Sequence, residues 1–370
     1  MTISPISPIS PGAAPAAPKW IATQAECDQA LLELASCDVI ALDTEFVRRK
    51  TYFAELGLIQ IASRTGVYLF DPTADYNDSA LGALLQNTAV VKVLHSVGED
   101  LEVLRDRFGA PAGPIFDTQI AAALAGLGAM QSLAKLVQNL LSEMLDKSET
   151  TSDWLKRPLT PGQIEYAAMD VRVLLPMFDL LNAKLAELGR TDWVTEDCAR
   201  VFEKATANEA DPQPHHKIKS THYLVEESQR KLWRVLNWRE AKARERNLPK
   251  SWVLDTQAAF EMAERLWRDE NHFQRELDVK APKSSKRGPE LWALLTKPAD
   301  DTGFEPAPRP LNAVLNERYK NLRAEVEARA AKLELAPELV ATRRMLESRV
   351  LGKPDTDEWL GWRGQVLKGI

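Results

Sequence analysis

Four carboxylates and one tyrosine in this 370-residue chain have types and spacings suited to chemistry. Asp43 and Glu45 directly follow the apolar residues 39–42. Because side chains at positions i and i+2 of a strand point to one face, both carboxylates converge on one point. Two acids held together repel each other and lose hydration, which favours a cation between them. The alternative is a strand end with two separately solvated acids.

The other candidates come from helical patterns. Asp100 lies in the first turn of a predicted helix over residues 99–108, which follows a predicted strand over residues 90–94. Sites often form where sheet strands end, although an Asp in a first helical turn also complements the helix dipole. Tyr166 and Asp170 are four residues apart and share a helix face. Their neighbours are apolar, so Asp170 needs a partner, and a salt-bridged or water-facing Asp is the alternative.

The patterns around these residues predict the elements that position them. Apolar runs at 39–42, 56–62, 67–70 and 90–94 indicate strands, and the turn residues 63–66 predict a hairpin between the second and third runs. A capping-box pattern at Thr23 predicts a helix to about residue 36. Helical periodicity dominates from Asp117 to about residue 204. This order predicts an α/β domain with a mixed sheet flanked by helices.

Polar, proline-bearing stretches suggest where the domains begin and end. We expect a disordered lead-in over residues 1–18, the α/β domain over 19–205, a linker over 206–220, one all-α domain over 221–296, a linker over 297–310, and a second all-α domain over 311–370. Charge is uneven along the chain: residues 1–220 hold 19 Lys and Arg against 29 Asp and Glu, a balance of −10. If this acidic part meets phosphate, bound divalent cations are one explanation.

Composition limits the class of protein. The three cysteines, Cys27, Cys37 and Cys198, are far apart and show no CxxC spacing, which argues against a thiolate zinc site and a disulfide framework and suits a reducing cytoplasm. No apolar run is long enough to span a bilayer. The first 18 residues lack the basic start and apolar core of a signal peptide.

Taken together, the acids and the tyrosine resemble the DEDDy 3′→5′ exonucleases, and among these the ribonuclease D family. Six ordered blocks carry the resemblance, and one departure from it is Thr151, where many relatives have a basic residue. The blocks are residues 40–46 (IALDTEF), 56–62 (LGLIQIA), 93–104 (VLHSVGEDLEVL), 116–123 (FDTQIAAA), 145–159 (LDKSETTSDWLKRPL) and 166–171 (YAAMDV).

Residues beyond the α/β domain carry a second resemblance. Residues 232–255 are similar to a helicase-and-RNase-D C-terminal (HRDC) domain, and residues 333–349 are similar to a more divergent copy. Such helical modules usually serve as auxiliary nucleic-acid-binding domains, while a packing or spacer role is the alternative. Arginines and tryptophans alternate between Arg230 and Arg239, where the Trp side chains are expected to be buried and the Arg side chains either contact phosphate or are solvated.

The resemblance implies an RNase H-like fold and a metal-dependent 3′→5′ exoribonuclease that uses two divalent ions, Mg²⁺ or Mn²⁺, to release nucleoside 5′-monophosphates. Asp43 would bridge both ions, Glu45 and Asp170 would hold one, and Asp100 would serve the other. Tyr166 would orient the attacking water or accept its proton. The expected partner is RNA, tRNA precursors in particular, for a monomeric protein with no membrane and no small-molecule cofactor. A DNA-directed exonuclease and a non-enzymatic RNA-binding protein are the alternatives.

Overall fold

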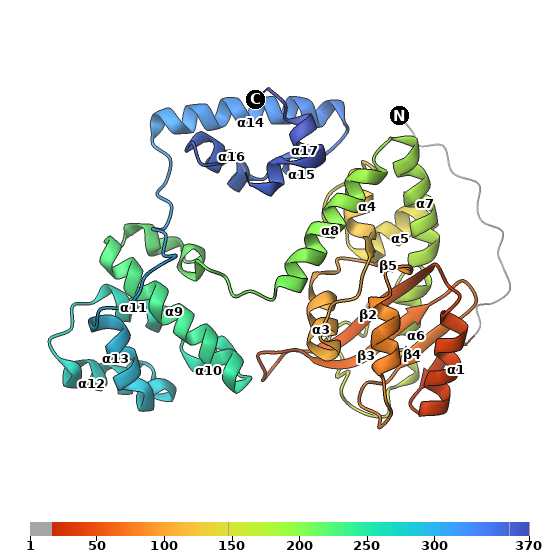
Figure 1. Ribbon diagram of the computed structural model, residues 1–370, viewed down its shortest axis with the longest axis horizontal. Helices are drawn as coiled ribbons and strands as arrows, with labels where there is room; N and C mark the ends of the chain where they lie inside the picture. Colours follow the sequence, from red (N-terminus) through yellow and green to blue (C-terminus); the bar gives the residue numbers. More distant parts are fainter. Residues whose placement is uncertain (1–16, 147, 355, 370) are drawn as a thin grey trace. The chain divides into compact units, whose positions relative to one another are not determined.

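The structure is a computed structural model that describes residues 17–146, 148–354 and 356–369. The chain divides into two compact units, whose helices and strands are labelled in Figure 1. The first contains residues 17–47, 56–207 and 312–369, and the second contains residues 48–55 and 208–311. The expected lead-in over residues 1–18 lies almost wholly outside the described residues. Within the described part of the chain, no helix is both long and apolar enough to cross a membrane.

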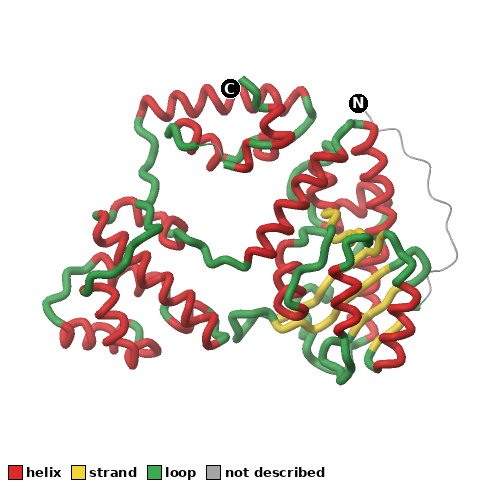
Figure 2. Tube along the Cα trace, viewed as in Figure 1, coloured by secondary structure: helices red, strands yellow, loops and turns green. Residues whose placement is uncertain are grey.

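The first unit is built on one sheet, whose strands are yellow in Figure 2. The described residues form six strands in the order β1-β4-β3-β2-β5-β6. β3 and β4 are the antiparallel hairpin that the turn residues predicted, whereas β1 pairs parallel to β4, and β2, β5 and β6 run parallel. The strands are β1 (Lys19–Ile21), β2 (Val39–Val47), β3 (Glu55–Ala62), β4 (Val67–Phe70), β5 (Val91–Leu94) and β6 (Ile115–Asp117).

Three details of the sheet differ from the prediction. The short strands β1 and β6 have no separate signal in the sequence. In addition, β2 continues to Val47, so Asp43 and Glu45 lie inside this strand instead of at its end. The β2–β5 pairing runs to Ala41 opposite Val93, and β5 ends one residue later. The acidic part of β2 therefore extends past the end of its neighbour, which leaves room beside it for other side chains.

Helices cover the sheet, which confirms the predicted α/β fold class. In the first unit α3 packs against β2, α6 against β2 and β4, α7 against β5, and α8 against β6. The helices before residue 208 are α1 (Gln24–Leu34), α2 (Ser79–Gln86), α3 (Gly98–Phe108), α4 (Thr118–Leu124), α5 (Leu133–Leu141), α6 (Pro161–Arg172), α7 (Leu174–Glu187) and α8 (Thr191–Ala207).

Local signals explain where the helices that carry functional candidates begin and end. α6 begins with a capping box in which Thr160 and Gln163 satisfy each other's backbone N–H groups, and Pro161 occupies its first turn. Such an N-cap stabilises a helix by about 1 kcal/mol. α3 ends at Gly109, whose φ of 79° is left-handed and suits glycine. The predicted capping box at Thr23 opens α1.

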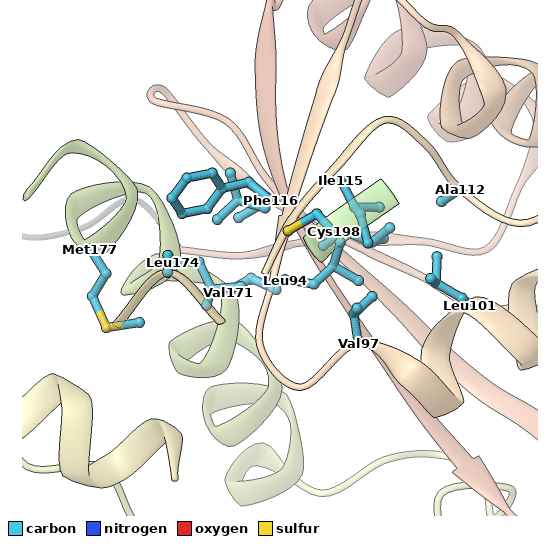
Figure 3. Close-up of a cluster of buried hydrophobic side chains, with 14 of the residues drawn as sticks. Leu94, Val97, Leu101, Ala112, Ile115, Phe116, Val171, Leu174, Met177 and Cys198 are labelled. Atoms are coloured by element: carbon cyan, nitrogen blue, oxygen red, sulfur yellow. The ribbon is translucent and has the colours of Figure 1, made fainter. Parts of the chain in front are cut away.

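α3 and α6 both contribute side chains to a buried apolar cluster (Figure 3). Leu94 of β5, Leu101 of α3, Phe116 of β6 and Val171 of α6 belong to it, and all four are less than 8% exposed. Leu101 and Val171 each directly follow a candidate acid, Asp100 or Asp170. Each acid therefore sits on a helix whose neighbouring side chain is fixed in the core.

The C-terminal segment of the first unit is continuous with the same core. Its helices contribute Val326, Ala330 and Trp362 to the cluster. The Trp362 indole stacks on Trp193 of α8 with ring centroids 4.5 Å apart, and Asp197 of α8 accepts a hydrogen bond of 3.1 Å from its Nε1. The helices are α14 (Ala313–Lys332), α15 (Pro337–Val340), α16 (Arg343–Val350), η4 (Asp357–Trp359) and α17 (Gly361–Val366).

The second unit is helical and has its own core, which includes Leu232, Phe273 and Leu291. Residues 206–220, expected to be a linker, contain one short 3-10 helix and the start of a second, in which His215 and, just beyond the range, Thr221 are buried. The elements are η1 (Pro214–Lys217), η2 (Lys219–Tyr223), α9 (Glu226–Arg246), α10 (Lys250–Val253), α11 (Thr256–Glu264), α12 (Glu270–Lys280), η3 (Pro282–Arg287) and α13 (Gly288–Thr296).

The basic and aromatic residues of α9 are mostly engaged inside the second unit. Arg234 pairs with Asp301 through hydrogen bonds of 2.6 and 2.5 Å, and Arg239 donates to the Thr256 hydroxyl at 2.9 Å. Trp233 donates its indole N–H to the carbonyl of Pro212. The sequence left these arginines open to phosphate or to solvent, and the structure shows Arg234 and Arg239 bound to protein partners.

Candidate active site

Three of the predicted acids meet at one point. Asp43 and Glu45 project from the same face of β2, and Asp170 projects from α6, which packs on that strand. One carboxylate oxygen from each of these residues lies within 4.8 Å of the other two. Asp170 is only 9% exposed, and the two acids of β2 are half-buried. The strand and helix periodicities used in the sequence prediction thus converge on a real cluster.

Asp100 reaches the cluster by a different route. It lies in the first turn of α3, is 8% exposed, and stands outside the group of three. The hydroxyl of Thr44, between the two acids of β2, donates a hydrogen bond of 2.5 Å to Asp100 Oδ1. Asp100 also raises the pKa of Asp43 by charge repulsion. The fourth acid therefore interacts with the cluster electrostatically and through Thr44.

The acids share a strong electrostatic penalty. Burial, followed by repulsion from Asp100, Glu45 and Asp170, raises the pKa of Asp43 well above its ordinary value. Burial raises the pKa of Glu45 to about 9, that of Asp100 to about 7 and that of Asp170 to about 6. The charged side chains that perturb Asp43 most are thus other carboxylates. A positive charge among them would remove this penalty.

The donor set fits a divalent cation. Carboxylate oxygens are the ligands that hard ions such as Mg²⁺ prefer, and Mn²⁺ accepts the same ligands. Three of them already lie close enough to share one ion. The buried acids therefore form a site that could hold a divalent metal ion.

Tyr166 lies beside the acids on α6. Its hydroxyl lies 3.5 Å from the Thr150 hydroxyl and is close enough to Asp170 for the two groups to shift each other's pKa. Its ring packs against Trp154, with centroids 6.0 Å apart and planes tilted by 42°. Burial and the nearby acids raise the pKa of Tyr166 above its ordinary value of 10. The phenol is therefore protonated at neutral pH, which suits a group that orients water better than one that takes a proton.

Several supporting residues were not predicted as functional. Trp154 is 2% exposed, and its carbonyl would lie 2.7 Å from a Cβ placed on Gly57 of β3. Glycine at this position therefore allows the segment after α5 to approach the sheet. Arg157 fixes the same segment through hydrogen bonds of 2.7 and 2.6 Å to Asp71. Gly57, Trp154 and Arg157 lie in two of the six sequence blocks, which is the signal that could have identified them; Thr44 is in a third.

Comparison with known proteins decides the family. A family described as 3′-5′ exonuclease matches residues 18–186, and the HRDC domain family matches residues 229–295. Ribonuclease D of Xanthomonas oryzae pv. oryzae is 36% identical over 352 residues, which cover 95% of this chain and 96% of that protein. Ribonuclease D of Pseudomonas paraeruginosa is 34% identical, with 94% and 96% covered. This chain belongs to the ribonuclease D family.

A solved structure supports the same assignment. The crystal structure of Escherichia coli RNase D, described as an exoribonuclease involved in structured RNA processing, matches with a TM-score of 0.81 and 29% identity. The match covers 94% of this chain and 96% of that one. Membership in the ribonuclease D family confirms the predicted 3′→5′ exoribonuclease and disfavours the DNA-directed and non-enzymatic alternatives. It also confirms that an HRDC domain follows the exonuclease domain.

Proposed function

We propose that this chain removes nucleoside 5′-monophosphates one at a time from RNA 3′ ends, tRNA precursors included, at Asp43, Glu45, Asp100, Asp170 and Tyr166. The proposal depends above all on the three carboxylates that meet within 4.8 Å inside an exonuclease domain. The reaction is a hydrolysis: water adds to the phosphorus, the P–O3′ bond breaks, and the shortened chain keeps a 3′-hydroxyl while the released nucleotide keeps the phosphate.

Each acid has a proposed place in a site for two divalent ions, Mg²⁺ or Mn²⁺. Asp43 would be shared, because it interacts with all three other acids. Glu45 and Asp170 would hold the first ion with it, and Asp100 would serve the second. When bound, such ions supply the positive charge that stabilises the attacking and leaving oxygens of a phosphodiester. They would also offset the acidic balance of this part of the chain.

Tyr166 has a positioning role in this proposal. The protonated phenol interacts with Asp170, and Trp154 packs against its ring and restricts its direction. Its hydroxyl oxygen is therefore available to orient the attacking water. The proton that this water loses goes to solvent instead of to the phenol.

Substrate class and cellular setting complete the proposal. The two named relatives are ribonucleases D, and the matched crystal structure is that of an exoribonuclease involved in structured RNA processing. By that similarity, structured RNAs with 3′ extensions, such as tRNA precursors, are the proposed substrates. The HRDC domain is a proposed RNA-binding auxiliary, and the protein is proposed to be a cytoplasmic monomer, in keeping with its three free cysteines.

Product analysis on matched substrates tests this function. The protein is given a tRNA precursor with a 3′ extension, a single-stranded RNA and a DNA strand of the same sequence, each with Mg²⁺ or Mn²⁺. We expect nucleoside 5′-monophosphates from both RNAs, slower release from DNA, and no release by the Asp43→Asn variant. Equal rates on RNA and DNA would overturn the substrate class, and nucleoside 3′-monophosphates would overturn the bond that breaks.

A further inference from the structure

A cavity of about 560 Å³ opens on the first unit at the start of α5. Its volume falls within the range of roughly 300–1,000 Å³ that is typical of ligand pockets. None of the predicted catalytic residues lines it. The described lining residues are Met130, Gln131, Ser132, Ala134, Lys135, Gln138, Met144 and Leu145.

The walls of this cavity combine apolar and hydrogen-bonding groups. The Met130 and Met144 side chains are 80% and 87% exposed, although large apolar side chains are usually buried. Methionine packs adaptably and favourably against aromatic rings. The Gln131 and Gln138 amides can both donate and accept hydrogen bonds, as the edges of nucleobases require. These walls suit a flat, heteroaromatic group with polar edges.

The cavity also offers positive charge. Lys135 is exposed, carries the charge among the described lining residues, and makes no salt bridge with any described residue. It is in the first turn of α5, where Ser132 is the N-cap and its side chain makes no capping hydrogen bond. A free ammonium group in the first turn of a helix, where the helix dipole is positive, is suited to a phosphate. Such a group stands out in a domain whose charge balance is strongly negative.

Two segments connect the cavity to the catalytic centre. Leu145 lines the cavity, and five residues later on the same segment the Thr150 hydroxyl lies 3.5 Å from the hydroxyl of Tyr166.

On the other side, the Gln131 carbonyl accepts a 2.9 Å hydrogen bond from Gln119 of α4. Asp117, at the start of α4, accepts hydrogen bonds of 3.1 Å from the backbone N–H groups of Ser96 and Val97. These residues directly precede α3, which carries Asp100. The cavity and the acids are thus supported by the same connected segments.

We propose that this cavity binds a nucleotide of the RNA substrate on the 5′ side of the scissile phosphate, with Lys135 on its phosphate and the methionines against its base. The proposal rests on the proposed exoribonuclease function. During 3′ trimming a single nucleotide lies on the 3′ side of the scissile bond, so the rest of the substrate extends on the 5′ side. A cavity that shares its supporting segments with the acids, and is lined for a base and a phosphate, therefore suits that part of the chain.

Two substrates separate the subsite from the catalytic centre. One is a single-stranded oligoribonucleotide, and the other is the p-nitrophenyl ester of a nucleoside 5′-monophosphate, in which the nitrophenyl group replaces the 5′-side nucleotide. For Lys135→Ala and for Met144→Ala we expect KM on the oligoribonucleotide to rise about fivefold to tenfold with kcat unchanged. The kcat/KM on the ester should stay within about twofold of wild type, since a nitrophenyl group offers no phosphate to this lysine.

The controls keep this test specific. Lys184→Ala removes the same charge from α7. Lys184 does not line the cavity, and it pairs with Glu187 at 3.1 Å, so this variant should hydrolyse both substrates with wild-type kinetics. Lys135→Arg should retain most of the affinity for RNA. Lys135→Ala should also reduce the slope of log KM against log salt concentration by about 0.7, the value for one phosphate contact on a single strand.

The other outcomes distinguish failure of the proposed exoribonuclease function from failure of the proposed subsite. If wild type hydrolyses neither substrate with any divalent metal, the proposed function itself fails. If wild type hydrolyses both and Lys135→Ala matches it in KM on RNA, the subsite is wrong while the function stands. Equal losses on both substrates would place Lys135 in the catalytic step and would also contradict the subsite.

Discussion

Thr44 on β2 donates a 2.5 Å hydrogen bond to Asp100 on α3, and so connects the strand that carries two acids to the helix that carries the fourth. This contact is buried, since Thr44 is 6% exposed and Asp100 8% exposed. It fixes one carboxylate oxygen of Asp100. Thr44 therefore has a positioning role that its residue type alone does not reveal.

We predict that Thr44→Val lowers kcat on RNA about tenfold with little change in KM, because Asp100 loses its fixed orientation. Mutation of residues that hold metal ligands in place typically lowers metal affinity or activity by about 10–100-fold. The Mn²⁺ concentration needed for half-maximal rate should rise as well. Thr44→Ser keeps the hydroxyl and should restore most of the activity. Steady-state kinetics over a Mn²⁺ titration would measure both effects. A Thr44→Val enzyme with the wild-type metal requirement would rule this role out.

Tyr166→Phe tests positioning against proton transfer. Removing the hydroxyl should lower kcat by about 10–100-fold. Loss of a general base usually lowers the rate more, by about 100–10,000-fold. Because burial holds the pKa of Tyr166 above 10, the wild-type rate should show no increase that follows ionisation of this phenol between pH 7 and pH 9. A pH–rate profile of the two enzymes measures this. If the wild-type profile has a rising limb that Tyr166→Phe removes, the phenol is the base.

Removal of metal should make stability depend on pH in a defined direction. The folded-state pKa values of Glu45, Asp100 and Asp170, about 9, 7 and 6, lie above those of the unfolded chain, about 4. The unfolded state therefore ionises first, and the free energy of unfolding of chelated protein should fall as pH rises from about 4 to about 9. Thermal melts in EDTA and in Mn²⁺ at pH 5, 7 and 9 would show it.

The control for this prediction is Asp43→Asn, which removes one charge from the cluster. In EDTA at pH 9 this variant should melt at a higher temperature than wild type, because one repulsive charge is gone. Adding Mn²⁺ should raise the melting temperature of wild type more than that of the variant. In EDTA, the difference in melting temperature between the variant and wild type should be larger at pH 9 than at pH 5. An equal difference at both pH values would contradict the electrostatic description of the site.

The C-terminal segment should stabilise the first unit. Trp362 is 2% exposed and stacks on Trp193, so Trp362→Ala should lower the free energy of unfolding of this unit by about 3–5 kcal/mol. Trp252 in the second unit is 43% exposed, and Trp252→Ala should cost less than about 1 kcal/mol. Urea denaturation of both variants provides the comparison. Equal effects would mean that the segment is not part of the core.

Local patterns in the sequence predicted much of the site. Strand alternation brings Asp43 and Glu45 to one face, and helical spacing does the same for Tyr166 and Asp170. The alternation does not depend on where β2 ends, which is why the acids were placed correctly although the strand continues to Val47. Ordered motif similarity supplied Asp100, which local periodicity alone explains equally well as a residue that complements the helix dipole.

What the sequence did not predict depends on contacts between distant residues. β1 and β6 are three residues long and form because neighbouring strands are available to pair with them. The Thr44–Asp100 contact joins residues 56 positions apart. Likewise, the sequence leaves Arg234 open to phosphate or to solvent, whereas in the structure Arg234 pairs with Asp301. No pattern over neighbouring residues contains this information.

Catalysis at the acidic cluster can be tested by following a 5′-labelled single-stranded oligoribonucleotide over time with Mg²⁺ or Mn²⁺. We predict a ladder that shortens one nucleotide at a time from the 3′ end and that disappears with EDTA and in Asp43→Asn, while this variant still binds the RNA. Single-step trimming at a near-normal rate by Asp43→Asn, or in EDTA, would show that the acidic cluster is not the catalytic metal site.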